Sequence, residues 1–182
     1  MNKPGKLTEL EFERVKEHAR AGFDMLREIW SLSAHAKIIV LQHHERYDGT
    51  GYPKGLKGQD IHMYGQIGAI ADVYDALTSD RTYRRRLLPN EAIDFLVGHG
   101  DRYFSKDIIT TFISVIAPYP IGTMVKLSTN DVGIVTEVDM KVATRPVVRI
   151  LRDAKGKELE PPLRTVYLDK DLTITIAKVI AD

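Results

Sequence analysis

Hydrophobic and polar positions follow two different periods along this chain of 182 residues. Up to about residue 117 the apolar residues recur every three or four positions, which is the spacing of amphipathic helices. Thr8 followed by Glu11 has the spacing of a capping box and predicts a helix start shortly after the Pro4-Gly5 turn. Gly22 marks a weak point at which this long helix is expected to be interrupted. Its apolar stripe comprises Leu10, Val15, Phe23, Leu26, Ile29 and Trp30.

Four further helical segments are predicted before residue 118. Ser33 is placed to cap the second one, which should end before the turn-rich stretch 48–53. The third covers about 62–77, where small residues would allow a neighbouring helix to approach closely. Pro89 and Ser105 stand near the starts of the last two. The apolar positions expected on the inner faces of these three helices are Ile67, Ile70, Ala71, Tyr74, Leu77, Ala92, Ile93, Leu96, Val97, Ile108, Ile109, Phe112 and Ile116.

After Pro118-Tyr119-Pro120 the pattern changes to short runs of β-branched residues separated by turns. These runs predict four strands, which form a small barrel or a curled sheet. The fold class is therefore predicted as mainly α, with a helical domain over 1–118 and a small β-rich, barrel-like domain over 119–182. The four strand ranges are 123–127, 133–138, 147–151 and 166–168.

Composition narrows the class of protein. The 26 basic and 25 acidic residues leave a net charge of +1, which disfavours both a disordered tail and a protein that binds nucleic acid polymers through bulk charge. Cysteine is absent, which excludes disulfides, thiolate zinc sites and cysteine nucleophiles. The sequence shows no apolar leader at its start and no run long enough for a membrane span. We expect a globular, cytoplasmic protein.

Histidine and aspartate residues offer candidate metal ligands. His43 and His44 are adjacent near a predicted helix end, and His18 lies on the first helix. Asp72 lies in the middle of the third helix, with Asp75 one turn later on the same face. Neutral imidazoles and carboxylates are ligands for zinc, iron, manganese or nickel. The pattern indicates a metal site, although a His-His pair is also compatible with ordinary surface polarity.

The geometry of a helix sets a condition for this site. Adjacent residues diverge by about 100°, so His43 and His44 can face one ion only if the helix ends there. Asp72 interrupts an apolar pattern, and if it is buried we expect a cation or strong donor beside it. By contrast, His35 and His99 are interpreted as ordinary helix residues, and His62 as a helix-start residue.

An arginine-rich segment follows the third helix. Residues 81–86 read RTYRRR, which puts four arginines in six positions. The planar guanidinium group suits phosphate oxygens, so a phosphate clamp beside the metal site is one interpretation. The alternative is a solvated run of charge.

Several of these stretches together closely resemble the HD-GYP family. Residues 43–53 read HHERYDGTGYP, 55–58 read GLKG and 71–81 read ADVYDALTSDR. The opening NKPGKLT over 2–8 is similar to the segment that leads into that family's ligand-bearing helix. The resemblance covers about 1–117 and is specific because the pattern is long and ordered.

The resemblance implies a helical, HD-type metal-dependent phosphodiesterase. Its members hydrolyse the bacterial second messenger cyclic di-GMP with a cluster of two or three metal ions, often iron or manganese. It places the metal ligands at His18, His43, His44 and Asp72, and we assign Asp72 the catalytic position as well. It places dinucleotide-binding residues at Asp75, Arg81 and Arg84, and the signature loop near the substrate at Gly51, Tyr52 and Pro53.

One departure from that family bears on activity. No His-Asp dipeptide occurs in the 182 residues, whereas in the family the aspartate of this pair bridges metals. Either the reading frame begins upstream of Met1 or the chain is a shortened, degenerate member. We therefore expect impaired hydrolysis and a residual three-histidine site that suits zinc or nickel. The competing hypothesis is a non-catalytic module for ligand binding or protein interaction, with a homodimer or a signalling protein as partner.

Overall fold

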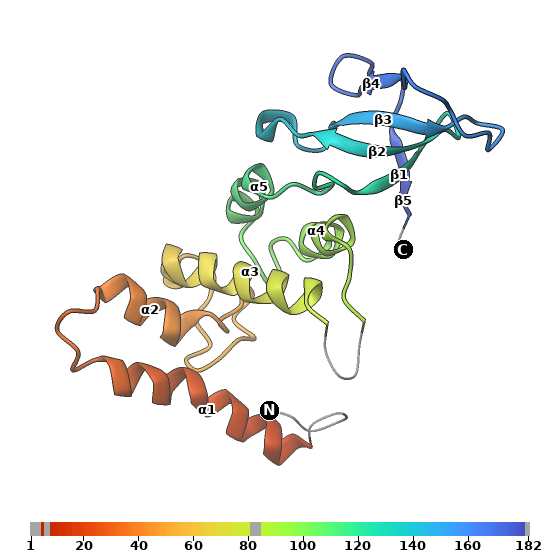
Figure 1. The fold of residues 1–182 in the computed structure, drawn as a ribbon. Coiled ribbons are helices and arrows are strands. Elements are labelled where there is room, and N and C mark those ends of the chain that lie inside the picture. The colour runs from red at the N-terminus through yellow and green to blue at the C-terminus, as the bar shows by residue number, and fades with distance from the viewer. Residues whose placement is uncertain (1–4, 6–7, 81–84, 181–182) are drawn as a thin grey trace. The chain divides into compact units, whose positions relative to one another are not determined.

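The computed structural model describes residues 5, 8–80 and 85–180 (Figure 1). The chain divides into two compact units, Met1–Phe112 and Ile113–Asp182. The boundary predicted after residue 118 lies inside the second unit, and it remains a prediction. The helices are α1 (Glu9–Leu26), α2 (Ala34–Gln42), α3 (Met63–Thr78), α4 (Pro89–Gly98) and α5 (Lys106–Val115). The strands are β1 (Met124–Leu127), β2 (Val132–Glu137), β3 (Val147–Arg152), β4 (Thr165–Tyr167) and β5 (Ile176–Val179).

Helix α1 begins as predicted and then runs without a break. The Thr8 hydroxyl accepts a hydrogen bond from the Glu11 backbone N–H, and the Glu11 carboxylate accepts one from the Thr8 N–H, which completes the capping box. The interruption predicted at Gly22 is wrong. A Cβ at this position would lie 3.0 Å from Val40 Cγ1, so the glycine allows α1 to approach α2. Ile29 and Trp30, which were expected to extend the stripe, lie after the helix and are exposed.

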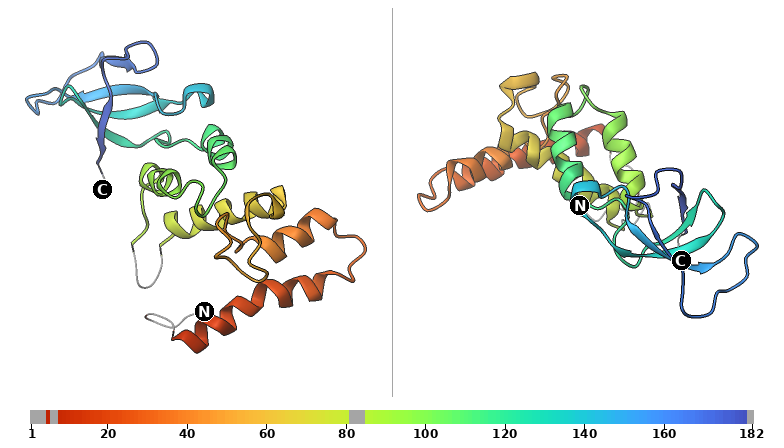
Figure 2. Two further views of the ribbon diagram at one scale, coloured as in Figure 1. Left: turned by 180° about the vertical axis from the view of Figure 1, so that it is seen from behind. Right: turned by 90° about the horizontal axis from the view of Figure 1, so that it is seen from above.

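Helix α2 packs against both α1 and α3, and Figure 2 shows it between them. The approach of α3 depends on two glycines, in agreement with its small residues. A Cβ on Gly65 would lie 2.7 Å from the Gln42 side chain, and one on Gly68 would lie 2.8 Å from Ile39 Cγ2. The close approach brings the C-terminal end of α2, which carries the adjacent histidines, against the face of α3 that carries Gly65 and Gly68.

The inner faces of α3 and α4 are narrower than the sequence pattern predicts. Ile70 and Leu77 are buried in α3, but Ile67 is 41% exposed and Ala71 is also exposed. In α4 the prediction fails at Val97, which is 55% exposed. The buried residues of α4 are Ala92, Ile93 and Leu96.

Within the described residues, no helix has the length and apolarity needed to cross a membrane.

The second unit contains one antiparallel sheet in the order β4-β3-β2-β1-β5. Strand β5 was missed, because 176–179 alternates only briefly after a turn. Among the described residues no pairing joins β4 to β5, so of the two predicted forms, a small barrel or a curled sheet, an open sheet is observed. Helices followed by strands are confirmed, but "mainly α" describes the first unit alone. The core of the sheet comprises Val125, Leu127, Val135, Val148, Ile150, Val166 and Leu168.

Candidate metal centre

Three imidazoles converge where α1 packs against the C-terminal end of α2. Helix α2 ends at Gln42 and His43 is its C-cap residue, so His44 leaves the helical path. The condition set by helix geometry is therefore met, and the His43 and His44 rings lie 4.1 Å apart. His18 on α1 completes the group, in which one ligand atom from each residue lies within 4.8 Å of the others. No other group of three or more such ligand residues occurs within the described part of the chain.

Backbone carbonyls fix the orientation of two of these rings. His43 Nδ1 lies 3.1 Å from Ile39 O and 2.9 Å from Val40 O, and His18 Nδ1 contacts Val15 O. A carbonyl can only accept, so both Nδ1 atoms carry the proton and donate it. With a single proton on each ring, the Nε2 atoms carry lone pairs, and these two atoms face each other at 3.2 Å. Two opposed lone pairs repel unless a proton or a cation lies between them.

His44 is the third member and stays neutral at physiological pH. Burial, followed by the neighbouring His43, His18 and Arg46, lowers the pKa of His44 to about 4. Its Nδ1 lies 3.9 Å from Asp72 Oδ2, so the carboxylate is beside the cluster without a close hydrogen bond to it. A shared proton can bridge only two nitrogens, whereas three imidazoles converge here. The arrangement therefore suits a divalent cation.

The loop after the histidines packs directly against them. A Cβ on Gly51 would lie 2.3 Å from Arg46 N and 2.5 Å from His44 O, so only glycine fits. The Tyr52 N–H donates to His44 O at 3.1 Å, and the Tyr52 ring lies 4.6 Å from the His44 ring. Burial, and then the Asp72 carboxylate, raises the pKa of Tyr52 to about 12, so the phenol keeps its proton.

A buried carboxylate anchors the rest of this loop. Glu45 is 2% exposed, and its oxygens accept from the backbone N–H groups of Lys54 at 2.8 Å and Leu56 at 2.9 Å. Upstream, Asp48 accepts from both the N–H and the hydroxyl of Thr50. Burial opposes ionisation of Asp48, but these bonds and Arg102 outweigh it and lower its pKa. Two carboxylates therefore hold the loop that carries Tyr52 against the histidines.

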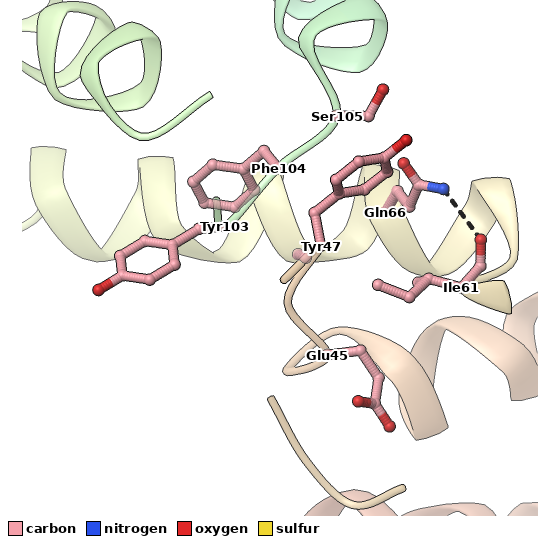
Figure 3. A pocket seen from close by; sticks show the side chains of 8 residues that line it. Glu45, Tyr47, Ile61, Gln66, Tyr103, Phe104 and Ser105 are labelled. Carbon is pink, nitrogen blue, oxygen red and sulfur yellow. Dashed lines mark hydrogen bonds between the residues drawn. The ribbon is translucent and has the colours of Figure 1, made fainter. Parts of the chain in front are cut away.

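The packing behind the loop leaves no room for a substrate. Figure 3 shows Glu45, Tyr47 and Gln66 lining a cavity of about 10 Å³, in which the Gln66 amide N–H donates to Ile61 O. A nucleotide needs a site of several hundred cubic ångströms. A larger, open cavity of about 290 Å³ lies in the second unit between Glu137 and Lys170, but it includes none of the predicted site residues. Neither of these cavities is lined by His18, His43 or His44, whose side chains are each partly exposed.

The remaining predicted site residues have different surroundings. If Asp72 were buried, a cation or a strong donor would be expected beside it. Its side chain is 48% exposed, so burial does not impose this requirement. Asp75 is also exposed, and its carboxylate accepts from the Ser79 hydroxyl at 3.3 Å. Arg81 and Arg84 lie outside the described residues. Pro53 follows Tyr52 in the packed loop. The ligand, catalytic and substrate-binding roles of these residues remain predictions.

Sequence reasoning missed two parts of the site. Glu45 is one, and the signal for it was an acidic residue directly beside two candidate ligands. Arg46 is the other: its guanidinium lies 4.3 Å from the Tyr103 ring centroid. Tyr103 also stacks on His99 at 4.9 Å, which explains why His99 is a packing residue. His62 caps α3 through its side chain, which accepts from the Tyr64 N–H, as a helix-start residue should.

The donor set fits a borderline divalent ion. A tetrahedral ion with nitrogen ligands at about 2.0–2.1 Å would place them about 3.3–3.4 Å apart. The 3.2 Å between the Nε2 atoms of His18 and His43 is close to that value, and His44 is within a small side-chain shift. Metal-binding histidines usually donate their other N–H to a carbonyl or carboxylate, as two of these do. The fold and site thus define a helical domain with a three-imidazole cluster that could hold a cation, joined to a small β unit.

Comparison with known proteins gives the family. The model of the "HD domain" family matches residues 1–108, more than half of the chain, and that of the "KOW domain associated with HD domain" matches 124–182. The chain belongs to the HD domain family, and the HD-GYP resemblance drawn from its sequence is confirmed.

Curated relatives have consistent names. The chain is 38% identical over 157 residues to the cyclic di-GMP phosphodiesterase PA4108 of Pseudomonas aeruginosa, covering 86% of this chain and 38% of that one. It is 42% identical to a cyclic di-GMP phosphodiesterase of Vibrio cholerae, over 62% of this chain and 24% of the relative. The 3'3'-cGAMP-specific phosphodiesterase 2 of the same organism is 37% identical, over 60% and 21%. The chain thus spans well under half the length of these relatives.

Proposed function

We propose that this chain is the metal-dependent phosphodiesterase region of a protein that acts on cyclic di-GMP. One observation carries the proposal: the Nε2 atoms of His18 and His43 face each other at 3.2 Å while their Nδ1 atoms are bonded to carbonyls. The family supplies the expectation of a metal. The substrate class comes from the names of the relatives, such as the cyclic di-GMP phosphodiesterase PA4108.

The proposed roles of the histidines, Asp72 and Tyr52 are supported by their positions, and those of Asp75, Arg81 and Arg84 by the resemblance to the HD-GYP family. His18, His43 and His44 would hold one divalent ion, with Asp72 able to approach from α3. Such an ion supplies Lewis-acid chemistry, which withdraws charge from phosphate oxygens and makes water a better nucleophile. Tyr52 keeps its proton and can donate it to an oxygen of the substrate. Arg81 and Arg84 would orient the phosphates, and Asp75 would position the dinucleotide.

The metal is proposed as iron or manganese in a complete centre, in line with the resemblance to HD-GYP proteins. The three-imidazole set by itself suits zinc or nickel as well. Because the chain has no His-Asp dipeptide, hydrolysis by these 182 residues alone is expected to be slow.

The second candidate function is a non-catalytic module that binds a dinucleotide or a protein. The exposed Asp72, which lies 3.9 Å from His44 and outside the three-residue cluster, favours it. A homodimer or a signalling protein would be the partner.

We place the protein in the cytoplasm, where a nucleotide messenger and a cysteine-free chain both belong.

Metal analysis combined with a hydrolysis assay tests the proposal. The purified chain should bind about one equivalent of manganese or zinc, measured by elemental analysis after dialysis. His44→Ala should lower that occupancy clearly, whereas His99→Ala, which changes a stacked histidine outside the cluster, should not. Slow, metal-dependent loss of cyclic di-GMP supports the enzyme. Binding of cyclic di-GMP without turnover supports the second candidate, and equal metal loss in both variants contradicts the metal centre.

A further inference from the structure

A lysine is held between two aromatic rings at the edge of the histidine cluster. Lys16 Nζ lies 4.8 Å from the Phe12 ring centroid and 5.9 Å from that of Tyr52. The two rings meet edge to face, with centroids 6.5 Å apart. Tyr52 in turn contacts the His44 and His18 rings, at 4.6 and 6.4 Å. The ammonium group is therefore one aromatic ring away from the cation centre.

The stability of α1 does not require this charge. Lys16 forms an ion pair with Glu13 at 2.6 Å, three residues earlier on the same helix, and the Glu13 side chain is 66% exposed. Exposed pairs of this kind contribute little to stability. The Lys16 side chain is 31% exposed, so its stem covers the rings while its charge stays reachable from solvent.

Phe12 adds a second feature that packing does not explain. The residue is 45% exposed although it stands on the side of α1 that meets the Tyr52 loop. An exposed aromatic ring beside a cation offers a nucleotide both a surface for base stacking and a partner for a phosphate. Phe12 and Lys16 are both partly exposed, and the Tyr52 ring that they contact also contacts the His18 and His44 rings.

We propose that Phe12, Lys16 and Tyr52 form a nucleotide-binding corner. Lys16 binds a phosphate of the cyclic dinucleotide, and the exposed part of the Phe12 ring stacks on a guanine base. Glu13 competes with that phosphate for Lys16. The inference rests on the proposed function, since it names further residues that hold the same ligand, and it predicts an effect of Glu13 that a purely structural lysine would not show.

Binding of cyclic di-GMP to the manganese-loaded chain tests the corner. Calorimetric titration in the cold, with chromatography to verify that the dinucleotide stays intact, gives the dissociation constant. Lys16→Gln should weaken binding about tenfold or more, because a charge-assisted hydrogen bond is lost. Lys16→Arg should retain most of the affinity. Phe12→Leu should weaken binding about fivefold through lost stacking. Glu13→Gln should strengthen it.

The matched control is Arg20→Gln on the same helix. Arg20 is paired with Asp24 at 4.0 Å, and its side chain is 80% exposed, so the same charge is removed one helical turn after Lys16, at a residue outside the corner. This variant should bind cyclic di-GMP like the wild type. Metal content and melting temperature are measured for every variant, and both should stay unchanged.

The outcomes separate this inference from the proposed function. If the wild type binds cyclic di-GMP and Lys16→Gln behaves like Arg20→Gln, the corner is wrong and the phosphodiesterase proposal stands. If Lys16→Gln loses metal together with affinity, the lysine is a structural residue and the inference is also wrong. If the metal-loaded wild type does not bind cyclic di-GMP at all, both proposals fail.

Discussion

Helix α1 and the β unit bury their apolar residues to very different extents. In the β unit Val125 and Ile150 have 0% exposure, and they belong to one continuous core. In α1 of the helical unit Ala19 is the one buried residue, whereas Leu10 is 80% and Met25 is 78% exposed. Hydrophobic burial is the main favourable term in folding, so the sheet is stabilised by its own core and α1 is not.

Helix α1 is held to α2 by contacts other than a large buried apolar face. Gly22 allows α1 to contact Val40. The Nε2 atom of His18 faces the Nε2 atom of His43, with the two lone pairs directed at each other. A cation between these rings would join the two helices and replace the repulsion by two ligand bonds. We infer that the region that carries the chemistry depends on its ligand for stability, and that the β unit does not.

The largest expected effect tests the independence of the β unit. Ile150→Ala removes a side chain with 0% exposure, and the lost burial and the cavity should cost about 2–5 kcal/mol. Hydrogen exchange should accelerate over β1 to β4, while metal content and exchange in α1 and α2 stay as in the wild type. Loss of metal in this variant would show that the two units are energetically coupled.

Metal addition tests the other half of the comparison. At a metal concentration one hundred times the dissociation constant, binding should stabilise the helical unit by about 2.7 kcal/mol. Hydrogen exchange over α1 and α2 should slow, and the sheet should be unaffected. His43→Ala should abolish the effect, whereas His35→Ala, a change in the same helix outside the cluster, should leave it intact. Equal protection of both units would contradict the comparison.

A smaller effect depends on pH and lies in the β unit. Burial of Asp131 alone would raise its pKa, but hydrogen bonds from Thr129 and Arg164 and the Arg164 charge outweigh it, so the pKa lies below the usual 3.8. The ionised form therefore stabilises the folded state above that value, and this contribution is lost as pH falls through the folded-state pKa. Asp131→Asn should cost about 1.5–3 kcal/mol at pH 7.

Urea unfolding at two pH values measures this contribution. The difference between wild type and Asp131→Asn should be smaller at pH 3 than at pH 7, because the wild-type carboxyl is then partly protonated. Asp171→Asn is the control, since that exposed carboxylate also accepts two hydrogen bonds from Thr173 and is influenced by the Arg145 charge, but within the described residues it forms no ion pair with an arginine. A difference that grows on acidification would contradict the assignment.

The smallest effect is expected at Trp30. This residue is 98% exposed at the end of the α1 region, so Trp30→Ser should change stability by less than about 0.5 kcal/mol. Thermal unfolding at low and high protein concentration measures it. A cost above about 1 kcal/mol that grows with protein concentration would show that a second copy of the chain covers the exposed residues of α1.

Local patterns in the sequence determined most of the element types. The capping box at Thr8 and the serine cap at Ser33 depend on residues three apart, and both occur as predicted. The runs of β-branched residues gave four of the five strands. The pairing of His43 with His44 could be anticipated because the turn residues that follow require the helix to end. Short-range sterics and hydrogen bonding decide such features, so the sequence alone suffices for them.

The tertiary structure decided what depends on partners far away in the chain. Gly22 does not interrupt α1, because its missing side chain leaves space for Val40. Asp72 interrupts the apolar pattern of α3, yet its side chain is 48% exposed and lies 3.9 Å from His44 Nδ1. Strand β5 forms because β1 offers it an unpaired edge. The facing lone pairs of His18 and His43 arise when two helices are packed together, and no spacing along the chain specifies the distance between their Nε2 atoms.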